Sequence, residues 1–273
     1  MISKLLKYFV ILPLDRIFFY LSSKLRGIAF VRLFNLYSFL NNSKNKINFK
    51  DNKYFCTERN WVFYHEKIGL YAYGKGFEKR KKELRISYHL DKIDFQNEDV
   101  IIDVGANNGD FYLNFNDQIN YYGFEPSPIV FSNLKHNIKN QKLFQKGLWN
   151  KEDKKIDFYL SDQWGDSSIL EIKRYLKKIS IETITLSKII TEIDKKVKLI
   201  KLEAEGAEPE ILDGLGEKID MVEYISIDCG FERGVQQKST LAECSNFLIN
   251  KNYEMIAFQS PRITALFKNK KYN

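Results

Sequence analysis

Apolar residues recur with two different spacings along this 273-residue chain. Over the first forty positions they recur every three to four residues, as around Leu5, Ile17 and Phe30, which is the spacing of helices. From Val100 onward, short runs rich in β-branched residues alternate with longer amphipathic stretches. This alternation predicts strands at 100–104, 121–125, 142–148, 155–160, 197–203, 222–228, 253–259 and 262–267, with helices near 109–117, 127–140, 185–194, 208–217 and 239–251.

Strands that alternate with helical stretches imply right-handed crossover connections and a mainly parallel sheet covered on both faces. We therefore expect an α/β fold in which ligands bind beyond the carboxyl ends of the strands. The final two strands are an exception, because only residues 260–262 join them. A connection of that length cannot contain a crossover helix, so we expect these strands to form an antiparallel hairpin.

The region before residue 96 has a different character. Residues 41–52 are rich in Lys and Asn and predict a loop, residues 61–73 are aromatic and strand-like, and residues 75–85 are a basic cluster that leads into a helix. We expect residues 1–95 to form a helical, aromatic and basic accessory region. Residues 96–273 are expected to form the main domain.

Two roles stay open for the helical residues 1–42. Charged residues interrupt their apolar segments and leave, for example, only seven uncharged residues from Tyr8 to Leu14. A membrane span needs ~20, so these residues are not expected to cross a membrane. They either lie on the inner face of a membrane as peripheral helices, or pack on the main domain or a second subunit.

Charge divides the chain in a similar way. Residues 1–95 hold 19 Lys and Arg against 8 Asp and Glu, whereas residues 96–273 hold 24 against 27. The basic N-terminal region suggests contact with an anionic partner, such as lipid headgroups, a phosphate-bearing substrate or nucleic acid. The alternative, which we favour, is a solvated lysine-rich surface that reflects the composition of the chain. Cys56, Cys229 and Cys244 form no CxxC pair, which argues against disulfide and zinc frameworks and predicts a cytoplasmic protein.

One strand end contains the most informative motif. Residues 100–110 read Val-Ile-Ile-Asp-Val-Gly-Ala-Asn-Asn-Gly-Asp, with Asn107 where a dinucleotide-binding G-x-G-x-x-G turn has its middle glycine, which disfavours a pyrophosphate cradle. Asp103 instead suits a cationic ligand such as S-adenosylmethionine, either directly or through the turn amides, and Glu125 suits its ribose hydroxyls. The predicted cofactor contacts are Asp103, Gly105, Ala106, Asn107, Gly109, Glu125 and Pro126.

Three segments together resemble the FkbM family of S-adenosylmethionine-dependent methyltransferases, namely Asp103 to Gly109, Phe124 to Pro128 and Lys201 to Glu208. The resemblance covers roughly residues 98–268. It implies a class I methyltransferase fold, a Rossmann-like sheet with a reversed final strand, and O-methylation of sugars or other hydroxyl-bearing metabolites, as in polysaccharide biosynthesis. One position departs from the family, which usually has Asp where this chain has Glu203.

O-methylation requires that donor and acceptor be aligned and that the hydroxyl proton be accepted. Lys201, Glu203 and Glu205 share one parity on a predicted strand, so we expect them to project to the same side. Glu203 is the first candidate for the base or acceptor contact and Glu205 the second, while an ion pair with a lysine is the alternative for Glu203. Glu208, followed by Pro209, is expected to stabilise a helix start.

Other strand ends provide candidate substrate residues. Asp228, a third candidate for catalysis, ends an apolar strand, and Arg233 follows it; the two either position the acceptor or bond each other. Trp164 and the 166–168 turn, which includes Ser167, predict a substrate or adenine loop, with a solvent-facing turn as the alternative. Histidines and cysteines show no metal-ligand spacing, so we expect no metal, although strand-end acids can assemble a Mg²⁺ site without a sequence signature.

Two further functions stay in view. The basic charge fits an RNA 2′-hydroxyl methyltransferase, although the chain lacks both the N-P-P-[YF] motif of amino-group methylation and the Pro-Cys nucleophile of C5 methylation. A noncatalytic S-adenosylmethionine-binding scaffold in glycan assembly is the alternative from another class. We expect a small-molecule or glycan substrate rather than nucleic acid, and the sequence leaves the oligomeric state open.

Overall fold

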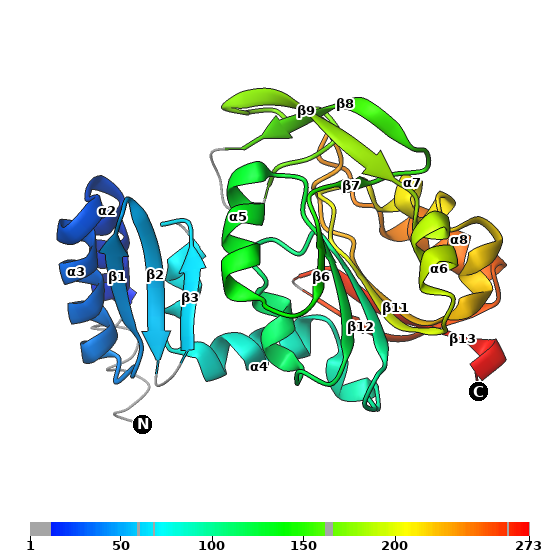
Figure 1. The fold of residues 1–273 in the computed structure, drawn as a ribbon. Helices are drawn as coiled ribbons and strands as arrows, with labels where there is room; N and C mark the ends of the chain where they lie inside the picture. Colours follow the sequence, from blue (N-terminus) through cyan, green and yellow to red (C-terminus); the bar gives the residue numbers. More distant parts are fainter. Residues whose placement is uncertain (1–11, 59–60, 68, 162–165, 261, 273) are drawn as a thin grey trace. The chain divides into compact units, whose positions relative to one another are not determined.

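The chain forms two compact units, Met1–Arg80 and Lys81–Asn273 (Figure 1). The computed structural model describes residues 12–58, 61–67, 69–161, 166–260 and 262–272. The unit boundary falls within helix α4 (Phe77–Ser87). Each unit has at least one sheet of its own.

The first unit combines two helices with a three-stranded antiparallel sheet. Its elements are α2 (Leu12–Lys24), α3 (Gly27–Leu40), β1 (Lys46–Lys50), β2 (Lys53–Glu58), β3 (Trp61–His65) and the 3-10 helix η2 (Gly69–Tyr73). The predicted helical spacing is confirmed over the described residues of α2 and α3. The predicted loop at 41–52 is wrong where β1 pairs with β2, because Asn35 hydrogen-bonds both the amide and the carbonyl of the fully buried Ile47.

Aromatic rings fill the core of the first unit. Phe30 and Phe34 lie one helical turn apart on α3 and are fully buried. Phe18 of α2 stacks on Tyr37 with the ring centroids 3.9 Å apart, and Tyr71 contacts Phe18 edge-on. Among the described residues, no helix is long and apolar enough to cross a membrane.

A seven-stranded sheet is the centre of the second unit. Its order is β6-β5-β4-β10-β11-β13-β12, with parallel pairing from β6 to β11 and β13 antiparallel to both of its neighbours. This confirms the α/β class I methyltransferase fold and the final antiparallel hairpin. The strands are β4 (Val100–Val104), β5 (Asn120–Phe124), β6 (Lys142–Phe144), β10 (Val197–Leu202), β11 (Val222–Asp228), β12 (Tyr253–Gln259) and β13 (Thr264–Asn269).

Helices cover this sheet on both faces, with α5 on one side and α6, α7 and α8 on the other (Figure 1). Successive residues of the central strands point to opposite faces of the sheet and so belong to two separate cores. Ile102, Ile200 and Ile225 pack in the core beneath α6, α7 and α8. Ile101, Leu199 and Tyr224 pack in the core beneath α5. The helices are α5 (Pro128–Asn137), α6 (Leu186–Ile193), α7 (Glu208–Asp213) and α8 (Leu241–Asn250), with 3-10 helices η3 (Leu90–Lys92), η4 (Asp110–Asn114), η5 (Gly216–Met221) and η6 (Lys270–Tyr272).

A second, smaller sheet contains β7 (Gly147–Leu148), β9 (Lys177–Ile184) and β8 (Asp153–Leu160), in that order. The single strand predicted at 142–148 is therefore wrong, because its two ends belong to different sheets. Gly147 permits the close approach of β9, since a Cβ at this position would lie 2.9 Å from Cδ1 of Ile181. Strand β9 itself was not among the predicted strands.

Two predicted helices differ from the structure. The segment at 109–117 contains only the 3-10 helix η4, because Asp110 to Leu113 are all buried and such a run has no solvent-facing side for an amphipathic helix. The predicted helix at 208–217 divides into α7 and η5. Gly214 lies at the division, and a Cβ there would lie 2.5 Å from the carbonyl oxygen of Trp149.

Candidate active site

The turn after β4 is closed against the neighbouring strands. Gly105 has φ +69°, and a Cβ there would lie 1.9 Å from the carbonyl oxygen of Glu203, so only glycine fits. The amide of Ala106 donates to the carbonyl oxygen of Phe124 over 2.9 Å. Asn107 has φ +49°, a left-handed conformation that Asn tolerates better than most residues. The turn is thus built from residues that permit a close approach of backbone segments.

Two asparagines and a second glycine attach this turn to α5. The side-chain amide of Asn133 donates to Oδ1 of Asn108 over 3.0 Å, and that of Asn137 donates to its carbonyl oxygen over 2.8 Å. Gly109 has φ +93°, and a Cβ there would lie 2.8 Å from Cδ1 of Ile138. Both glycines of the motif therefore make room for protein atoms.

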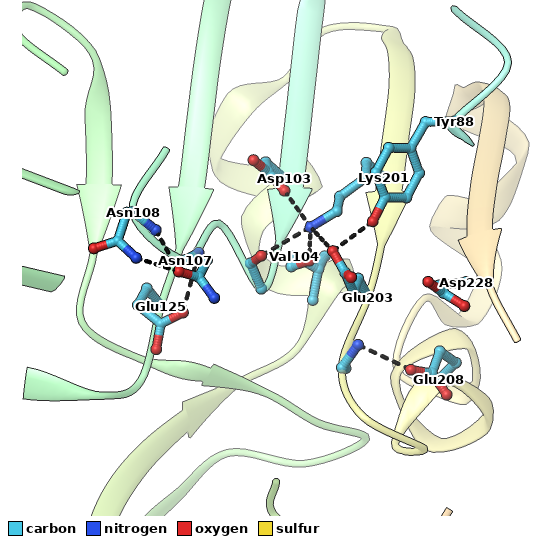
Figure 2. Close-up of polar contacts among 12 residues, drawn as sticks. Tyr88, Asp103, Val104, Asn107, Asn108, Glu125, Lys201, Glu203, Glu208 and Asp228 are labelled. Carbon is cyan, nitrogen blue, oxygen red and sulfur yellow. Dashed lines mark hydrogen bonds and ion pairs between the residues drawn. The ribbon is translucent and has the colours of Figure 1, made fainter. Parts of the chain in front are cut away.

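Glu125 follows β5 beside this turn, as Figure 2 shows. Its Oε2 accepts a hydrogen bond from the amide of Asn107 over 3.1 Å, and its Oε1 accepts one from the amide of Ser127 over 2.8 Å. Pro126 lies between Glu125 and Ser127 and is partly exposed. The residues predicted to bind the cofactor thus come together at the carboxyl ends of β4 and β5.

Lys201 of β10 is the centre of the polar network in Figure 2. Its ammonium lies 3.0 Å from both Oδ1 of Asp103 and Oε2 of Glu203. It also donates to the carbonyl oxygens of Val104, over 3.1 Å, and Gly105, over 2.8 Å. Lys201 and Asp103 are partners in the parallel register of β10 and β4, which brings their side chains together. These contacts offset the cost of burying the ammonium and link β10 to the turn after β4.

Asp103 is fully buried beneath the turn. Its Oδ2 accepts a hydrogen bond from the hydroxyl of Tyr121. Burial raises the pKa of Asp103, an effect that the charge of Lys201 opposes. Two roles were expected for Asp103, direct contact with a ligand and support of the turn. Its buried position favours support of the turn.

Glu203 is held by three side chains. Arg262 forms an ion pair with its Oε1, while Tyr88 donates to its Oε2, which Lys201 also contacts. Burial favours a raised pKa for Glu203, but the charges of Lys201 and Arg262 outweigh it and lower the pKa to about 2. The ion pair with a lysine, which was the alternative role for Glu203, is therefore present, and Glu203 is a weak proton acceptor.

Tyr88 and Arg262 were not among the candidate residues. Arg262 Nε donates to Oδ2 of Asp228 over 2.6 Å, and its Nη2 donates to the hydroxyl of Tyr88 over 2.8 Å. The hairpin between β12 and β13 was predicted, and because β12 runs parallel to β11, its connection lies at the carboxyl edge. The predicted hairpin could therefore have identified Arg262 as a residue of the site. Tyr88 follows α4, and no sequence feature indicated that it would lie there.

Asp228 and Arg233 have different partners. Asp228 pairs with Arg262, whereas Arg233 donates to both carboxylate oxygens of Glu210 over 2.8 and 2.6 Å. A third bond joins Arg233 to the carbonyl oxygen of Gly206 over 2.5 Å. The interpretation that Asp228 and Arg233 bond each other is therefore wrong, and Arg233 stabilises the start of α7.

Glu205 lies beyond the end of β10 and has φ +51°. The alternation of side chains that places Lys201 and Glu203 on the same side therefore does not extend to Glu205. Burial and the charge of Glu232 raise the pKa of Glu205 well above its usual range. Burial and the charge of Asp228 likewise raise the pKa of Glu232 to about 8. These two carboxyls accept protons far more readily than Glu203.

The loop that contains residues 166–168 contacts the Glu205 turn. The hydroxyl of Ser168 donates to the carbonyl oxygen of Glu205 over 3.0 Å, and the charge of Asp166 contributes to the raised pKa of Glu205. The hydroxyl of Ser167 accepts the amide hydrogen of Ser161 over 3.0 Å. Trp164 lies outside the described residues. The predicted substrate loop thus borders the candidate base.

Glu208 is the first residue of α7 and is almost fully buried. Its Oε1 accepts amide hydrogen bonds from Ala204 over 2.8 Å and from Gly206 over 3.2 Å. Burial raises the pKa of Glu208 to about 7, and these hydrogen bonds only partly oppose the effect. Glu208 therefore stabilises the turn that precedes α7, in agreement with its expected role at a helix start.

Within the part of the chain that the structure describes, no group of three or more His, Cys, Asp or Glu residues has an arrangement able to hold a metal ion. The expectation of a metal-independent site stays a prediction. Cys56, Cys229 and Cys244 are all buried free cysteines, so they act as core residues.

Comparisons with known proteins agree with this architecture. The model of the methyltransferase FkbM domain matches residues 103–255, more than half of the chain. "Methyltransferase 1" of Beauveria bassiana (strain ARSEF 2860) is 25% identical over 199 residues, which cover 62% of this chain and 80% of the relative.

Two solved structures show a weaker likeness. The methyltransferase FkbM of Methylobacillus flagellatus KT is 16% identical with a TM-score of 0.47, over 73% of this chain and 53% of that one. This chain thus matches about half of its length. Magnesium protoporphyrin IX methyltransferase of Synechocystis PCC 6803 with bound SAM is 9% identical with a TM-score of 0.40, over 71% of this chain and 79% of that one. From its domain match, the chain belongs to the FkbM family of methyltransferases.

Proposed function

We propose that this methyltransferase transfers a methyl group from S-adenosylmethionine to a hydroxyl group of a sugar, glycan or related metabolite. The observation that carries the proposal is the surplus of carboxyl groups at the carboxyl edge of the sheet. Glu205 and Glu232 have raised pKa values, because burial and neighbouring carboxylates disfavour their ionised forms. Such a site suits a cationic donor and an acceptor whose proton has to be removed.

The turn after β4 and the end of β5 would hold the donor. S-adenosylmethionine supplies an activated methyl group on a sulfonium centre when it is bound. Amides of Asn107 and Ser127 orient the carboxylate of Glu125 at a strand end where this class of fold binds ribose hydroxyls. Asp103 and Lys201 would keep the turn in shape from below, because both are buried.

Glu205 is the residue that we assign to accept the proton of the acceptor hydroxyl. Glu203 was the first candidate from the sequence, but its ion pairs with Lys201 and Arg262 lower its pKa to about 2. A base is most effective when its pKa lies near the working pH, which favours a carboxyl group with a raised pKa. Glu232 supports the assignment, because its charge contributes to the raised pKa of Glu205.

A nucleic acid is a less suitable acceptor than a sugar. The unit Lys81–Asn273 contains 28 Lys and Arg against 30 Asp and Glu, so it has no positive excess with which to neutralise a phosphate backbone. The three buried free cysteines suit a reducing compartment. We therefore propose that the reaction takes place in the cytoplasm. With a sugar or glycan as acceptor, it would belong to the biosynthesis of polysaccharides or related glycans.

Turnover is the direct test of this function. Purified full-length protein is incubated with S-adenosylmethionine and a panel of sugars, nucleotide sugars, glycans and a short RNA, and S-adenosylhomocysteine release is measured by mass spectrometry. Release with a sugar or glycan is the expected result. Tight donor binding without release on any acceptor indicates a noncatalytic scaffold, and release on RNA alone indicates an RNA enzyme.

Two substitutions separate donor binding from proton transfer. Glu205→Gln is expected to lower kcat by about 100-fold while donor affinity stays unchanged, because a general base contributes to the chemical step. Glu125→Ala is expected to weaken donor binding by about tenfold in calorimetry, since a carboxylate hydrogen bond is lost. The exposed Glu217→Gln is the matched control. Full turnover in Glu205→Gln would remove Glu205 as the base.

A further inference from the structure

The positive charge of the chain is concentrated near its beginning. The first fifty residues contain nine Lys and Arg and one acidic residue, Asp15, a net charge of +8. The other 223 residues contain 34 of each kind and are neutral overall. The charge of the whole chain, +8, thus arises in the segment that includes α2, α3 and β1.

The same helices expose large apolar side chains. Helix α3 buries Phe30 and Phe34, yet Ile28, Leu36 and Leu40 are 61, 55 and 69% exposed. Leu36 follows Ile28 by eight positions and Leu40 follows Leu36 by four, so the three side chains lie on one side of the helix. Phe39 of α3 and Ile17, Phe19, Tyr20 and Leu21 of α2 are also exposed. A helix that is apolar on its outer side as well as its inner side requires a further apolar partner.

Basic side chains from distant parts of the sequence gather where α2 ends and α3 begins. Lys67 donates to the carbonyl oxygen of Ser23 over 3.1 Å, next to Lys24. Burial lowers the pKa of Lys67, and the charge of Arg26 lowers it further, which indicates that the two cations are close. We call Lys24, Arg26 and Lys67 the basic corner. Arg16 and Arg32 add two exposed cations on the helices themselves.

We propose that the outer surfaces of α2 and α3, with the basic corner, bind the anionic surface of a phospholipid bilayer. The apolar side chains enter the boundary between headgroups and acyl chains, and the cations pair with lipid phosphates. Tyr20 is of an aromatic type that favours this boundary, and Phe19 and Phe39 are typical of the apolar face of an interfacial helix. The contact is peripheral, because none of the described helices is long and apolar enough to cross a membrane.

Charge distinguishes this partner from a second copy of the chain. A symmetric dimer through these helices packs the same surface patch of both copies together. Arg16, Lys24, Arg26 and Arg32 of one copy then face an equally positive surface. Helices α2 and α3 contain only one carboxylate, Asp15, which already accepts a hydrogen bond from Tyr37. An anionic bilayer supplies the opposite charge instead.

Vesicle flotation tests this proposal independently of the methyltransferase reaction. Full-length protein is mixed with vesicles of phosphatidylcholine alone or with roughly 30 mol% phosphatidylglycerol, the anionic content being chosen to create a negative surface potential. Flotation with the anionic vesicles, and its loss in high salt, is the expected result. Protein that stays at the bottom of the gradient with anionic vesicles in low salt overturns the proposal.

Matched variants assign the binding to these residues. Lys24→Glu with Arg26→Glu is expected to weaken binding by about fivefold or more per residue, and Leu36→Glu with Phe39→Glu to abolish it. Ile249→Glu, 52% exposed on α8, is the control and should float like the wild type. Circular dichroism confirms that each variant is folded. If Leu36→Glu with Phe39→Glu dissociates a dimer in sedimentation velocity and leaves flotation unchanged, the face is an interface between copies instead.

Discussion

At the scale of single residues, the chemistry at the sheet edge depends on how cations are distributed among carboxylates. Lys201 and Arg262 hold Glu203 in its ionised form, whereas Glu205 has raised proton affinity through burial and the charge of Glu232. Both carboxylates belong to the same short sequence, and both were candidates for the base. Their pKa values diverge because Arg262, from the connection between β12 and β13, neutralises Glu203, whereas Glu232, from the segment after β11, adds negative charge near Glu205; the fold brings these distant residues to the end of β10.

Replacement of Lys201 should test the importance of the buried network. Lys201→Met leaves Asp103 buried without its cation, so we expect the free energy of unfolding to fall by about 3 kcal/mol. Urea denaturation followed by circular dichroism measures it. Lys178→Met is the control, because its ion pair with Asp157 is exposed, and no measurable change is expected. Equal stability of the two variants would contradict the network's role.

Glu208 should make stability depend on pH. In the folded chain its pKa is about 7, raised from 4.5, so between these values the unfolded chain loses the proton and the folded chain retains it. The free energy of unfolding therefore falls as pH rises across this range, by up to about 3 kcal/mol. Glu208→Gln should remove this loss and gain stability relative to the wild type over the same range. A difference between the two proteins that stays constant with pH would contradict the assignment.

At the scale of elements, the turn after β4 shows how steric demands select residues. Gly105→Ala combines a left-handed φ of +69° with a Cβ placed 1.9 Å from the carbonyl oxygen of Glu203. Gly216→Ala is a matched control, because its φ is +53° and no atom lies within 4 Å of the added Cβ. We expect about 1 kcal/mol of destabilisation for Gly216→Ala and more than about 3 kcal/mol for Gly105→Ala, measured by urea denaturation. Similar losses would mean that the clash is relieved by movement of β10.

Strands were predicted correctly where their own run of apolar residues is distinctive. The prediction failed where a strand forms because of the segments with which it pairs. The strands at 100–104, 222–228 and 253–259 agree with β4, β11 and β12, because their apolar runs are long and bounded by turn residues. The single strand at 142–148 was wrong, since Gly147 belongs to a second sheet through its contact with β9. Strand β1 was hidden by its Lys- and Asn-rich composition and is stabilised by Asn35 of α3.

At the scale of the whole molecule, the two units have separate cores. Phe34 is fully buried in the aromatic core of the first unit, so Phe34→Ala should reduce the stability of that unit by about 3–5 kcal/mol. Hydrogen exchange measured by mass spectrometry is expected to show faster exchange in β1 and β2 and unchanged exchange in β4 and β10. Phe39→Ala, 77% exposed, is the control. Equal acceleration in both units would indicate a single cooperative unit.

The sequence by itself determined the α/β fold, the final hairpin and the family, because apolar periodicity, connection length and strand-end motifs are local features. It also placed acidic residues at the ends of β4, β5, β10 and β11, where parallel strands meet at one edge. Only the tertiary structure decided which acids are neutralised. Arg262 reaches Glu203 from 59 positions away, and Lys201 meets Asp103 through strand register, contacts that no spacing along the chain specifies.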